Sequence, residues 1–491
     1  MTFPANGRHP SHPFARRGTP RVAQARRRDA EYLLRVPNDA AGGPVTKSST
    51  QGSGWSTRDW VALAGITTLA GLLRLVRLGD PDVLVFDEAH YVQDACRYAF
   101  GMAEVCLKWV RPAYEVHPPL GKWLIAGGIA GFGYTAVGWR ISAAIAGTLT
   151  VMLLYLTARR LLQATGPALV AALLLAIDLI HFVQSRLGML DVFLAFFTTA
   201  SVLCCLYDRD RDPVERLSQA PVRQRHPWRF AAGAAAGAAI ACKWPGVFAL
   251  ATVLILVFWW ECSARVSEKR LIAVIRTVRE EGLSIVASLV ITPLLVYVLS
   301  YAARYPPTLL TGRFWADFAR YHQFVWLYHS RFGGSHTAQS PPWSWFIPAQ
   351  PLAYFHEYAR LGCREVAAFA SPFWLLALLA VVLITIRAAR TRSLGDAEGV
   401  ILSGFALSYL PWLLVARNRS GIFIFYMLPT VPFLALALAH LATRMRRAIA
   451  VWTLLSVAFF VFYYPRMTAV AHLERLPVHS RACAGVSEYP P

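Results

Sequence analysis

Charged residues are scarce in this sequence: they occupy only 16% of its 491 positions, whereas hydrophobic residues occupy 56%. Apolar runs of about 17 to 24 residues recur between Trp60 and Tyr464, and a helix of that length can cross the hydrocarbon core of a bilayer. This pattern excludes an ordinary soluble domain. The sequence therefore predicts an all-α polytopic membrane protein.

Acidic residues are scarcer than basic ones, because 28 Asp and Glu residues stand against 49 Lys and Arg residues and give a net charge of +21. A basic surplus of this size also occurs in nucleic-acid-binding proteins. Here, however, Lys and Arg lie in short clusters between the apolar runs. We therefore expect no nucleic-acid partner, and we assign the basic clusters to the cytoplasmic side of a membrane.

The first 58 residues have no apolar h-region and are rich in Arg, Pro, Gly and Ser, which argues against a signal peptide and against a folded domain. We expect a disordered basic cytoplasmic tail over residues 1–58. A transmembrane catalytic domain over residues 59–464 and an outer tail over residues 465–491 complete the predicted organisation.

The apolar run from Leu120 to Tyr134 decides the topology, because it is short and rich in glycine. If it crossed the membrane, every later basic cluster would lie outside; if it lies at the outer interface, all of them lie inside, as the positive-inside rule requires. We therefore predict eleven spans with outer loops at residues 79–137 and 303–365. The predicted spans are Trp60–Leu78, Gly138–Leu162, Gly166–Phe182, Gly188–Tyr207, Phe230–Lys243, Pro245–Glu261, Ser284–Ala302, Val366–Ile386, Val400–Ala416, Ile422–Leu441 and Ala448–Tyr464.

The eight cysteines form no CxxC motif, and no His-rich spacing is present, so no structural metal site is expected. Four cysteines fall outside in this topology, where disulfides are chemically permitted, although the sequence does not determine their pairing. These are Cys96, Cys106, Cys363 and Cys483.

Asp87 and Glu88 lie in the first outer loop beside Phe86 and Tyr91. Partly apolar surroundings at the bilayer surface raise the pKa of a carboxylate and make it a usable general base. Two solvated loop acids or a helix N-terminal pair are the structural alternatives. We take Asp87 and Glu88 as candidate catalytic residues and Tyr91 as a candidate contact of the acceptor or the sugar.

A second group of the same loop could bind an anion. His117 precedes two prolines that suit the start of a helix, and Lys122 lies one turn into that helix. Arg140 opens the next span at the same face, where a guanidinium group could bind a phosphate with two hydrogen bonds. A plain turn and an arginine that snorkels to the interface are the alternatives.

Polar residues recur at later outer turns. Asp178 lies within an apolar run, where Arg186 is a plausible partner and a structural brace is the expected role. Lys243 begins a "KWPG" break that suits either a helix break or a ligand contact. Exposed aromatic residues of the second loop suit a peptide or a sugar. The remaining candidates are His336, Ser340 and Trp343 as contacts and Arg74, Arg186, Asp191, Arg417 and Tyr426 as supporting residues; the run Gly233 to Gly237 is expected to pack helices closely.

Seven motifs in order resemble one family, the protein O-mannosyltransferases that use a polyprenyl- or dolichyl-phosphate mannose donor, within the GT-C superfamily of membrane glycosyltransferases. The resemblance runs from Arg74 to Pro432. The motifs are "RLVRLGDPDVLVFDEAHY", "HPPLGKW", "WRISAAIAGT", "DLIHFVQSRLGMLDVFLAFF", "CKWPG", "SPPWSW" and "RSGIFIFYMLPTVPF".

The resemblance implies a GT-C fold with about eleven spans and juxtamembrane helices in the first outer loop. It also implies that Asp87 is the base on the acceptor hydroxyl, that Glu88 helps to position a substrate, and that Arg140 binds the donor phosphate, with His117 and Lys122 on the donor side. Residues 303–365 are too few to hold the MIR domain of eukaryotic members, so the chain is similar to compact bacterial members.

The expected reaction is inverting transfer of mannose to Ser or Thr of translocated proteins at the outer face of the plasma membrane. The expected partners are polyprenyl-phosphate mannose, protein acceptors, the secretion translocon and the lipid bilayer. No cofactor is expected beyond this lipid-linked co-substrate and no residue is assigned to a metal site, while the sequence does not determine whether a divalent metal ion is needed. The alternatives are a GT-C transferase with another sugar or a glycolipid acceptor, and a transporter or flippase, which the lack of internal repeats disfavours.

Overall fold

The computed structural model describes residues 54–101, 104–107, 115–211, 226–265, 269–302, 311–331, 338–348, 351–359, 362–417 and 421–471. The chain divides into two units at Gly54, and the described helices and strands all lie in the unit that begins at Trp55. Residues 1–53 of the expected tail over residues 1–58 lie outside the described residues. His336 and Cys483 also lie outside them.

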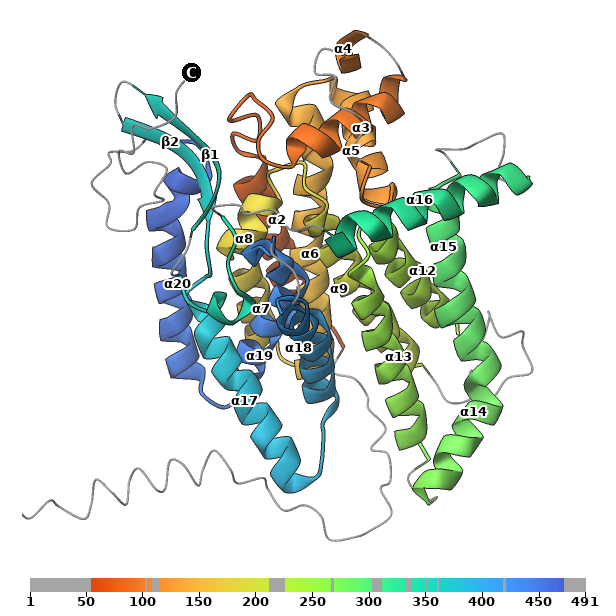
Figure 1. Ribbon diagram of the computed structural model, residues 1–491. Helices are drawn as coiled ribbons and strands as arrows, with labels where there is room; N and C mark the ends of the chain where they lie inside the picture. The colour runs from red at the N-terminus through yellow and green to blue at the C-terminus, as the bar shows by residue number, and fades with distance from the viewer. Residues whose placement is uncertain are drawn as a thin grey trace, which may run out of the picture. The chain divides into compact units, whose positions relative to one another are not determined.

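Helices dominate the described unit (Figure 1). The first part contains α2 (Thr57–Leu75), α3 (Glu88–Phe100), α4 (Glu104–Leu107), α5 (Leu120–Phe132), α6 (Ala136–Leu162), α7 (Thr165–Ala176), α8 (Leu179–Gln184) and α9 (Asp191–Arg209). The second part contains α12 (Pro227–Cys242), α13 (Gly246–Ser263), α14 (Arg270–Val286), a π-helical turn (Ala287–Ile291), α15 (Thr292–Ser300) and α16 (Gly312–Arg331). The last part contains a turn (Pro342–Ser344), β1 (Leu352–Ala359), β2 (Gly362–Ala368), α17 (Phe373–Thr391), α18 (Asp396–Val415), a 3₁₀ turn (Ile424–Thr430), α19 (Val431–Ala442) and α20 (Arg446–Met467).

Ion pairs join the helix ends that carry the basic clusters, and we call this side of the unit the basic end. Asp59 at the start of α2 pairs with Arg159 at the end of α6 at 2.7 Å. Ion pairs also connect α6 to α9, α9 to α18, and α17 to α18. The opposite side, which carries α3, α16 and the β-hairpin, is the loop end (Figure 1). The start of α2, the ends of α6, α9 and α17 and the start of α18 thus lie together, and the side of the membrane that they face stays a prediction.

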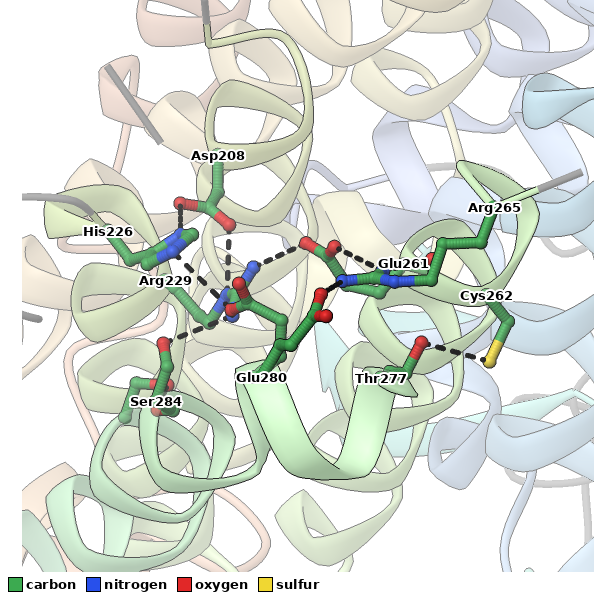
Figure 2. Close-up of polar contacts among 11 residues, drawn as sticks. Asp208, His226, Arg229, Glu261, Cys262, Arg265, Thr277, Glu280 and Ser284 are labelled. Carbon is green, nitrogen blue, oxygen red and sulfur yellow. Dashed lines mark hydrogen bonds and ion pairs between the residues drawn. The ribbon is translucent and has the colours of Figure 1, made fainter. Parts of the chain in front are cut away.

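Arg229 is the centre of a buried ionic cluster at the basic end (Figure 2). Its guanidinium group donates to Asp208 at 2.9 Å, to Glu261 at 2.7 Å and to Glu281 at 2.8 Å. His226 lies 3.2 Å from Asp208 in the same cluster. Because these groups come from α9, α12, α13 and α14, the cluster fixes four helices against one another.

The short helix α5 lies at the loop end. With 13 residues it reaches about 20 Å, which is less than the hydrocarbon thickness. It packs on α3 and on the first half of α6, where Gly128 approaches the carbonyl of Gly138. Because Asp59 and Arg159 meet at the basic end, α2 and α6 run in opposite directions without a crossing by α5.

Eight helices of the described residues are long and apolar enough to cross a membrane. Helical segments also occupy the other three predicted positions, as α2, as α7 followed by α8, and as α12. The count of eleven crossings stays a prediction. The eight are Ala136–Leu162, Asp191–Arg209, Gly246–Ser263, Arg270–Ser300, Phe373–Thr391, Asp396–Val415, Ile424–Ala442 and Arg446–Met467.

The glycines of α12 allow the close packing that the sequence predicts. A Cβ atom on Gly233 would lie 1.8 Å from the carbonyl oxygen of Ser288, and one on Gly237 would lie 2.6 Å from the backbone of Pro293. Both contacts fall on the π-helical turn and the start of α15. Small residues therefore bring these two helices into backbone contact.

A β-hairpin in the second outer loop was not predicted. β1 and β2 pair antiparallel and form the one sheet of the described residues. The predicted start of the eighth span at Val366 is wrong, because Val366 pairs with Phe355 in the hairpin and α17 begins at Phe373. The apolar residues of β2 run directly into those of α17, and Pro372 marks the change because proline suits a helix start.

A disulfide joins Cys96 in α3 to Cys106 in α4, at the loop end. Cys363 in β2 is also disulfide-bonded. The free cysteines of the described residues are Cys204, Cys205, Cys242 and Cys262, all on the longer helices. The structure thus supplies a pairing that the sequence left open.

Candidate active site

Asp87 and Glu88 are adjacent in sequence, but they have different surroundings. Asp87 occupies the N-cap position of α3, is half-buried, and makes no capping hydrogen bond. Glu88 is the first residue of α3 and is fully buried. The side chain of Asp87 is therefore partly accessible, whereas that of Glu88 lies in the protein interior.

Glu88 and Arg140 form a buried pair with two hydrogen bonds, of 2.8 and 2.9 Å. The remaining three donors of the guanidinium group go to the carbonyl oxygens of Leu78, Pro81 and Val83. All five N–H groups of Arg140 are thus in use, and its side chain has no exposed surface. This geometry does not support the expected contact with the donor phosphate; it makes Arg140 a brace for the loop that precedes Asp87.

Two backbone amides complete the surroundings of Glu88. Its carboxylate accepts hydrogen bonds from the amide of Val85 at 3.0 Å and from the amide of Gly188 at 2.7 Å. Glu88 thereby ties α3 to α6 and to the segment that leads into α9. It has no lone pair directed at a substrate, so its geometry fits a positioning residue for Asp87.

Phe86 adopts a left-handed backbone conformation, with φ of 50°, directly before Asp87. Such a conformation costs on the order of 1–3 kcal/mol in a non-glycine residue and persists where packing holds it. The ring of Phe86 contacts Tyr354 at 5.3 Å, Phe425 at 6.0 Å and Phe423 at 6.1 Å. An aromatic cage therefore fixes the turn that presents Asp87.

Tyr91 lies one helical turn after Asp87 and donates a hydrogen bond to its Oδ2 atom at 3.0 Å. Burial, followed by the negative charge of Asp87, raises the pKa of the Tyr91 hydroxyl well above its usual value. The hydroxyl therefore stays protonated and serves as a donor. It orients Asp87 and leaves the Oδ1 atom for another partner.

An ion pair of distant sequence origin lies beside Asp87. Lys243, which follows α12, donates to both oxygens of Asp191 at 2.9 and 3.0 Å, and Asp191 begins α9. The ammonium group also lies 4.9 Å from the ring of Tyr426, which stacks on Trp412. The charge of Asp87 acts on both members of the pair. Asp191 and Tyr426, predicted as supporting residues, thus come together with Asp87.

A small pocket adjoins this ion pair. It is bounded by α9, α13, α18 and the 3₁₀ turn before α19. Its lining combines carboxylate, hydroxyl and aromatic groups, which is a chemistry suited to a polar ligand with apolar faces. The lining residues include Asp191, Thr198, Ser408, Trp412 and Tyr426.

Lys122 and His117 are close to the site, and both contact other side chains there. Lys122 donates to Asp94 at 2.8 Å and both side chains are buried, so the geometry does not support a phosphate contact by Lys122. The ring of His117 contacts Tyr91 at 5.8 Å and stacks on His329 of α16 at 5.2 Å. The prolines after His117 do start a helix, because α5 begins at Leu120.

Helix α16 lies across the loop-end tips of α12, α13 and α15 (Figure 1). Its Tyr321 donates to the carbonyl oxygen of His117 at 2.9 Å, and His329 contacts the carbonyl oxygen of Val116 at 2.8 Å. Burial lowers the pKa of His322 on the same helix. The helix therefore holds the turn at His117 in place through these two contacts.

Arg74 and Arg186 serve as internal braces. Arg186 donates to carbonyl oxygens at the end of α2, with the shortest contact, 2.6 Å, to Val76. The predicted pairing of Arg186 with Asp178 is wrong: Asp178 accepts from Ser371 and Trp374 at 2.6 Å. An arginine held by a helix C-terminus satisfies the carbonyl groups that a helix leaves unpaired. Arg74 contacts His181 at 2.8 Å in the interior.

The candidates of the later outer loops are dispersed. Ser340 is buried and accepts from the indole of Trp345 at 2.9 Å, which gives it a local structural contact. Trp343 is exposed, as a surface contact residue would be. Arg417 is exposed at the end of α18. His336 lies outside the described residues.

The described residues contain no group of three or more His, Cys, Asp or Glu side chains placed to hold a metal ion. The site instead offers a half-buried carboxylate oriented by a tyrosine, an adjacent Lys243–Asp191 pair, and aromatic walls. Such a set can remove a proton from a hydroxyl group and bind a polar ring. Sequence reasoning missed Gln184 and Tyr354, which meet near Phe86. Gln184 lies inside one of the seven motifs but was not singled out there, and Tyr354 lies in none of them.

Comparisons with known proteins identify the family. The family model described as dolichyl-phosphate-mannose-protein mannosyltransferase matches residues 64–305. A polyprenol-phosphate-mannose–protein mannosyltransferase of Corynebacterium glutamicum is 30% identical over 78% of this chain and 82% of its own length. One of Mycolicibacterium smegmatis is 29% identical over 81% and 84%, respectively.

A solved structure shows the same fold. The Saccharomyces cerevisiae protein O-mannosyltransferase Pmt1–Pmt2 complex bound to the sugar donor matches with a TM-score of 0.70 at 15% identity, covering 88% of this chain and 94% of that chain. The predicted GT-C fold is thus confirmed. The identity over most of both chains, the family model and this fold together confirm the resemblance, and the chain belongs to the dolichyl- and polyprenol-phosphate-mannose–protein mannosyltransferase family.

Proposed function

We propose that the protein transfers mannose from polyprenyl-phosphate mannose to Ser or Thr hydroxyl groups of proteins. Asp87 takes the proton of the hydroxyl group. The hydroxyl oxygen then forms a bond to the anomeric carbon from the face opposite the phosphate, and the bond from that carbon to the phosphate oxygen breaks. The electron pair leaves with polyprenyl phosphate, so the configuration at the anomeric carbon inverts.

The observation that carries this proposal is the division of roles between Asp87 and Glu88. Glu88 is saturated by Arg140 and two amides, whereas Asp87 is half-buried, carries one hydrogen bond from Tyr91, and is held by the Phe86 turn. A base must lie within hydrogen-bond reach of the proton that it removes. The fixed and accessible carboxylate of Asp87 fits that role.

For the leaving phosphate, we propose Lys243 as the principal cation. Lys243 is paired with Asp191, which lines the pocket, and it lies against the faces of Phe425 and Tyr426. In contrast, all five N–H groups of Arg140 are in use, and Lys122 is paired with Asp94, which does not line the pocket. An ammonium group near the site of bond cleavage stabilises the charge that develops on the phosphate. Lys243→Met should therefore weaken donor use more than acceptor use.

We place the reaction at the outer face of the plasma membrane. Two features support this side: the basic clusters gather at the opposite end, as cytoplasmic loops do, and the Cys96–Cys106 disulfide suits an oxidising compartment. The acceptors would then be proteins that reach this face through the secretion translocon.

The decisive experiment measures transfer of labelled mannose from polyprenyl-phosphate mannose to a peptide rich in Thr and Pro. Asp87→Asn should reduce transfer by about 100-fold or more, the usual contribution of a general base. Asp82→Asn, in the same loop but exposed, is the matched control and should leave the rate unchanged. Full activity of Asp87→Asn at normal protein levels would remove Asp87 from the base role.

The same assay separates the rival reactions. Label that appears in a lipid fraction and not in the peptide would change the acceptor class to a glycolipid. Absence of transfer from the mannosyl donor, with activity on another lipid-phosphate sugar, would change the donor. Each result keeps the fold and replaces one substrate.

A further inference from the structure

The β-hairpin brings a tyrosine from a remote part of the chain to the candidate site. Ala353 pairs with Ala367 and Phe355 pairs with Val366, so Tyr354 between them has no partner in β2. A bulge of this kind redirects the side chain of the extra residue and is frequent beside active sites. Tyr354 is 5% exposed and its ring contacts Phe86, the residue directly before Asp87.

Gln184 at the end of α8 meets this tyrosine. Its amide nitrogen donates to the Tyr354 hydroxyl oxygen at 2.8 Å, and its side chain has no exposed surface. The segment that follows Gln184 supplies the amide of Gly188 to Glu88 and then Asp191. The Gln184–Tyr354 pair therefore lies next to the same short segment that positions Asp87.

The pair leaves hydrogen-bonding capacity unused. The carbonyl oxygen of Gln184 is buried without a partner, and no acceptor among the described residues takes the hydroxyl hydrogen of Tyr354. Turning the amide over exchanges the roles of the two groups, but two donors and one acceptor stay unpaired in either orientation. A buried polar group without a partner is uncommon in native proteins and calls for an explanation.

We propose that Tyr354 and Gln184 together bind one hydroxyl group of the transferred sugar and so contribute to donor specificity. This assignment rests on the proposed function. A sugar hydroxyl both donates and accepts a hydrogen bond, which matches a free donor and the free acceptor of the pair. The rings of Phe86 and Tyr354 supply the apolar surface that the face of a sugar ring needs.

The charges around the pair keep it neutral and ready to donate. Burial, together with the nearby carboxylates of Asp191 and Asp87, raises the pKa of Tyr354 far above its usual value. The hydroxyl group therefore keeps its proton throughout the physiological range. The ring of Tyr354 contacts Phe86, the residue before Asp87, and Phe86 contacts Phe425, whose ring lies 5.4 Å from the ammonium group of Lys243. These contacts place the pair near both the base and the Lys243–Asp191 pair.

The test compares donors in which each hydroxyl group of mannose is replaced in turn by hydrogen, with the purified full chain and a Thr peptide. In the wild type, one of these donors should lose about tenfold in kcat/KM relative to the parent donor. Tyr354→Phe keeps the ring against Phe86 and removes only the hydroxyl group. In this variant the kcat/KM for the parent donor should fall by a similar factor. The further loss in kcat/KM on removing that one sugar hydroxyl should disappear.

Tyr155→Phe is the matched control, because Tyr155 is fully buried and its hydroxyl donates to the carbonyl oxygen of Asp59 at the basic end. It should keep the wild-type pattern of penalties. Equal losses by Tyr354→Phe on every donor, or a change confined to the KM of the peptide, would overturn the assignment. Gln184→Met should repeat the effect of Tyr354→Phe. A wild type that transfers mannose from no donor would overturn the proposed function itself, and this inference with it.

Discussion

At the scale of residues, two adjacent carboxylates have different roles because their surroundings differ. Glu88 is enclosed by a guanidinium group and two amides, and Asp87 is left half-buried with a tyrosine donor. Burial of an unpaired charge is costly, so the pair with Arg140 is a requirement for placing Glu88 in the interior. The rigid anchor at Glu88 holds its neighbour in a fixed position.

This arrangement predicts that Arg140 matters first for stability. Arg140→Met should lower the free energy of unfolding by about 3–5 kcal/mol, because the Glu88 carboxylate stays buried without its partner. The double variant Glu88→Leu with Arg140→Met should cost clearly less than the sum of the two single changes. Thermal unfolding of the purified protein in detergent provides the measurement.

The same variants decide between a brace and a phosphate ligand. Glu88→Gln, which keeps the shape of the side chain, should lower both stability and the rate of transfer. If Arg140→Met instead left the unfolding temperature unchanged and raised only the KM of the lipid donor, the expected phosphate contact would be restored.

At the scale of elements, the helices are held together by buried polar clusters at both ends. The sequence predicted the positions of the helices, because the length of an apolar run is set by the thickness of a bilayer. It counted Arg229 only among the basic residues of a cytoplasmic loop. Its three carboxylate partners come from three other helices, and their convergence depends on packing that one sequence does not reveal.

The Arg229 cluster yields a prediction about helix assembly. Arg229→Met leaves Asp208, Glu261 and Glu281 close together without a central cation, so the free energy of unfolding should fall by about 3–5 kcal/mol. The activity of the protein that stays folded should change little, since the cluster joins the end of α9 to the start of α12, at the basic end and away from α3. Thermal unfolding and transfer rate per folded molecule measure the two effects.

A suitable control lies in the same cluster. Arg265 lies at the edge of the cluster: its closest carboxylate is Glu280 at 2.8 Å, which is 53% exposed, and it reaches the Glu261 carboxylate only at 3.4 Å. A surface ion pair contributes about 0–1 kcal/mol, so Arg265→Met should have a small effect. If the two substitutions lowered the free energy of unfolding equally, burial would not determine how much each arginine contributes to stability.

At the scale of the whole molecule, the sequence was most informative about topology and least informative about the second outer loop. The short length of the run at Leu120 and the order of the basic clusters predicted that α5 does not cross, and the Asp59–Arg159 pair agrees. The hairpin was missed because the apolar residues of β2 merge with those of α17. Tyr354 was missed with it, since a bulge that redirects one side chain has no sequence signature.

The motifs predicted where the site lies but not what each polar residue does there. The order Asp87, Glu88, Lys122, Arg140 gives no partners, and the structure shows that three of the four pair with distant residues or with each other. The predicted roles of individual site residues stay predictions. Only a three-dimensional arrangement distinguishes a saturated arginine from one that is free to bind a phosphate.

The topology itself can be tested with single cysteines on either side. Asp82 is exposed in the first outer loop, and Ser393 is exposed between α17 and α18 at the basic end. Asp82→Cys should react with a membrane-impermeant maleimide on intact cells, whereas Ser393→Cys should react only after permeabilisation. The wild type, whose free cysteines among the described residues all lie on the longer helices, gives the background signal. Because the basic clusters set orientation, reaction of Ser393→Cys on intact cells would reverse the assigned sides and move the proposed transfer to the cytoplasmic face.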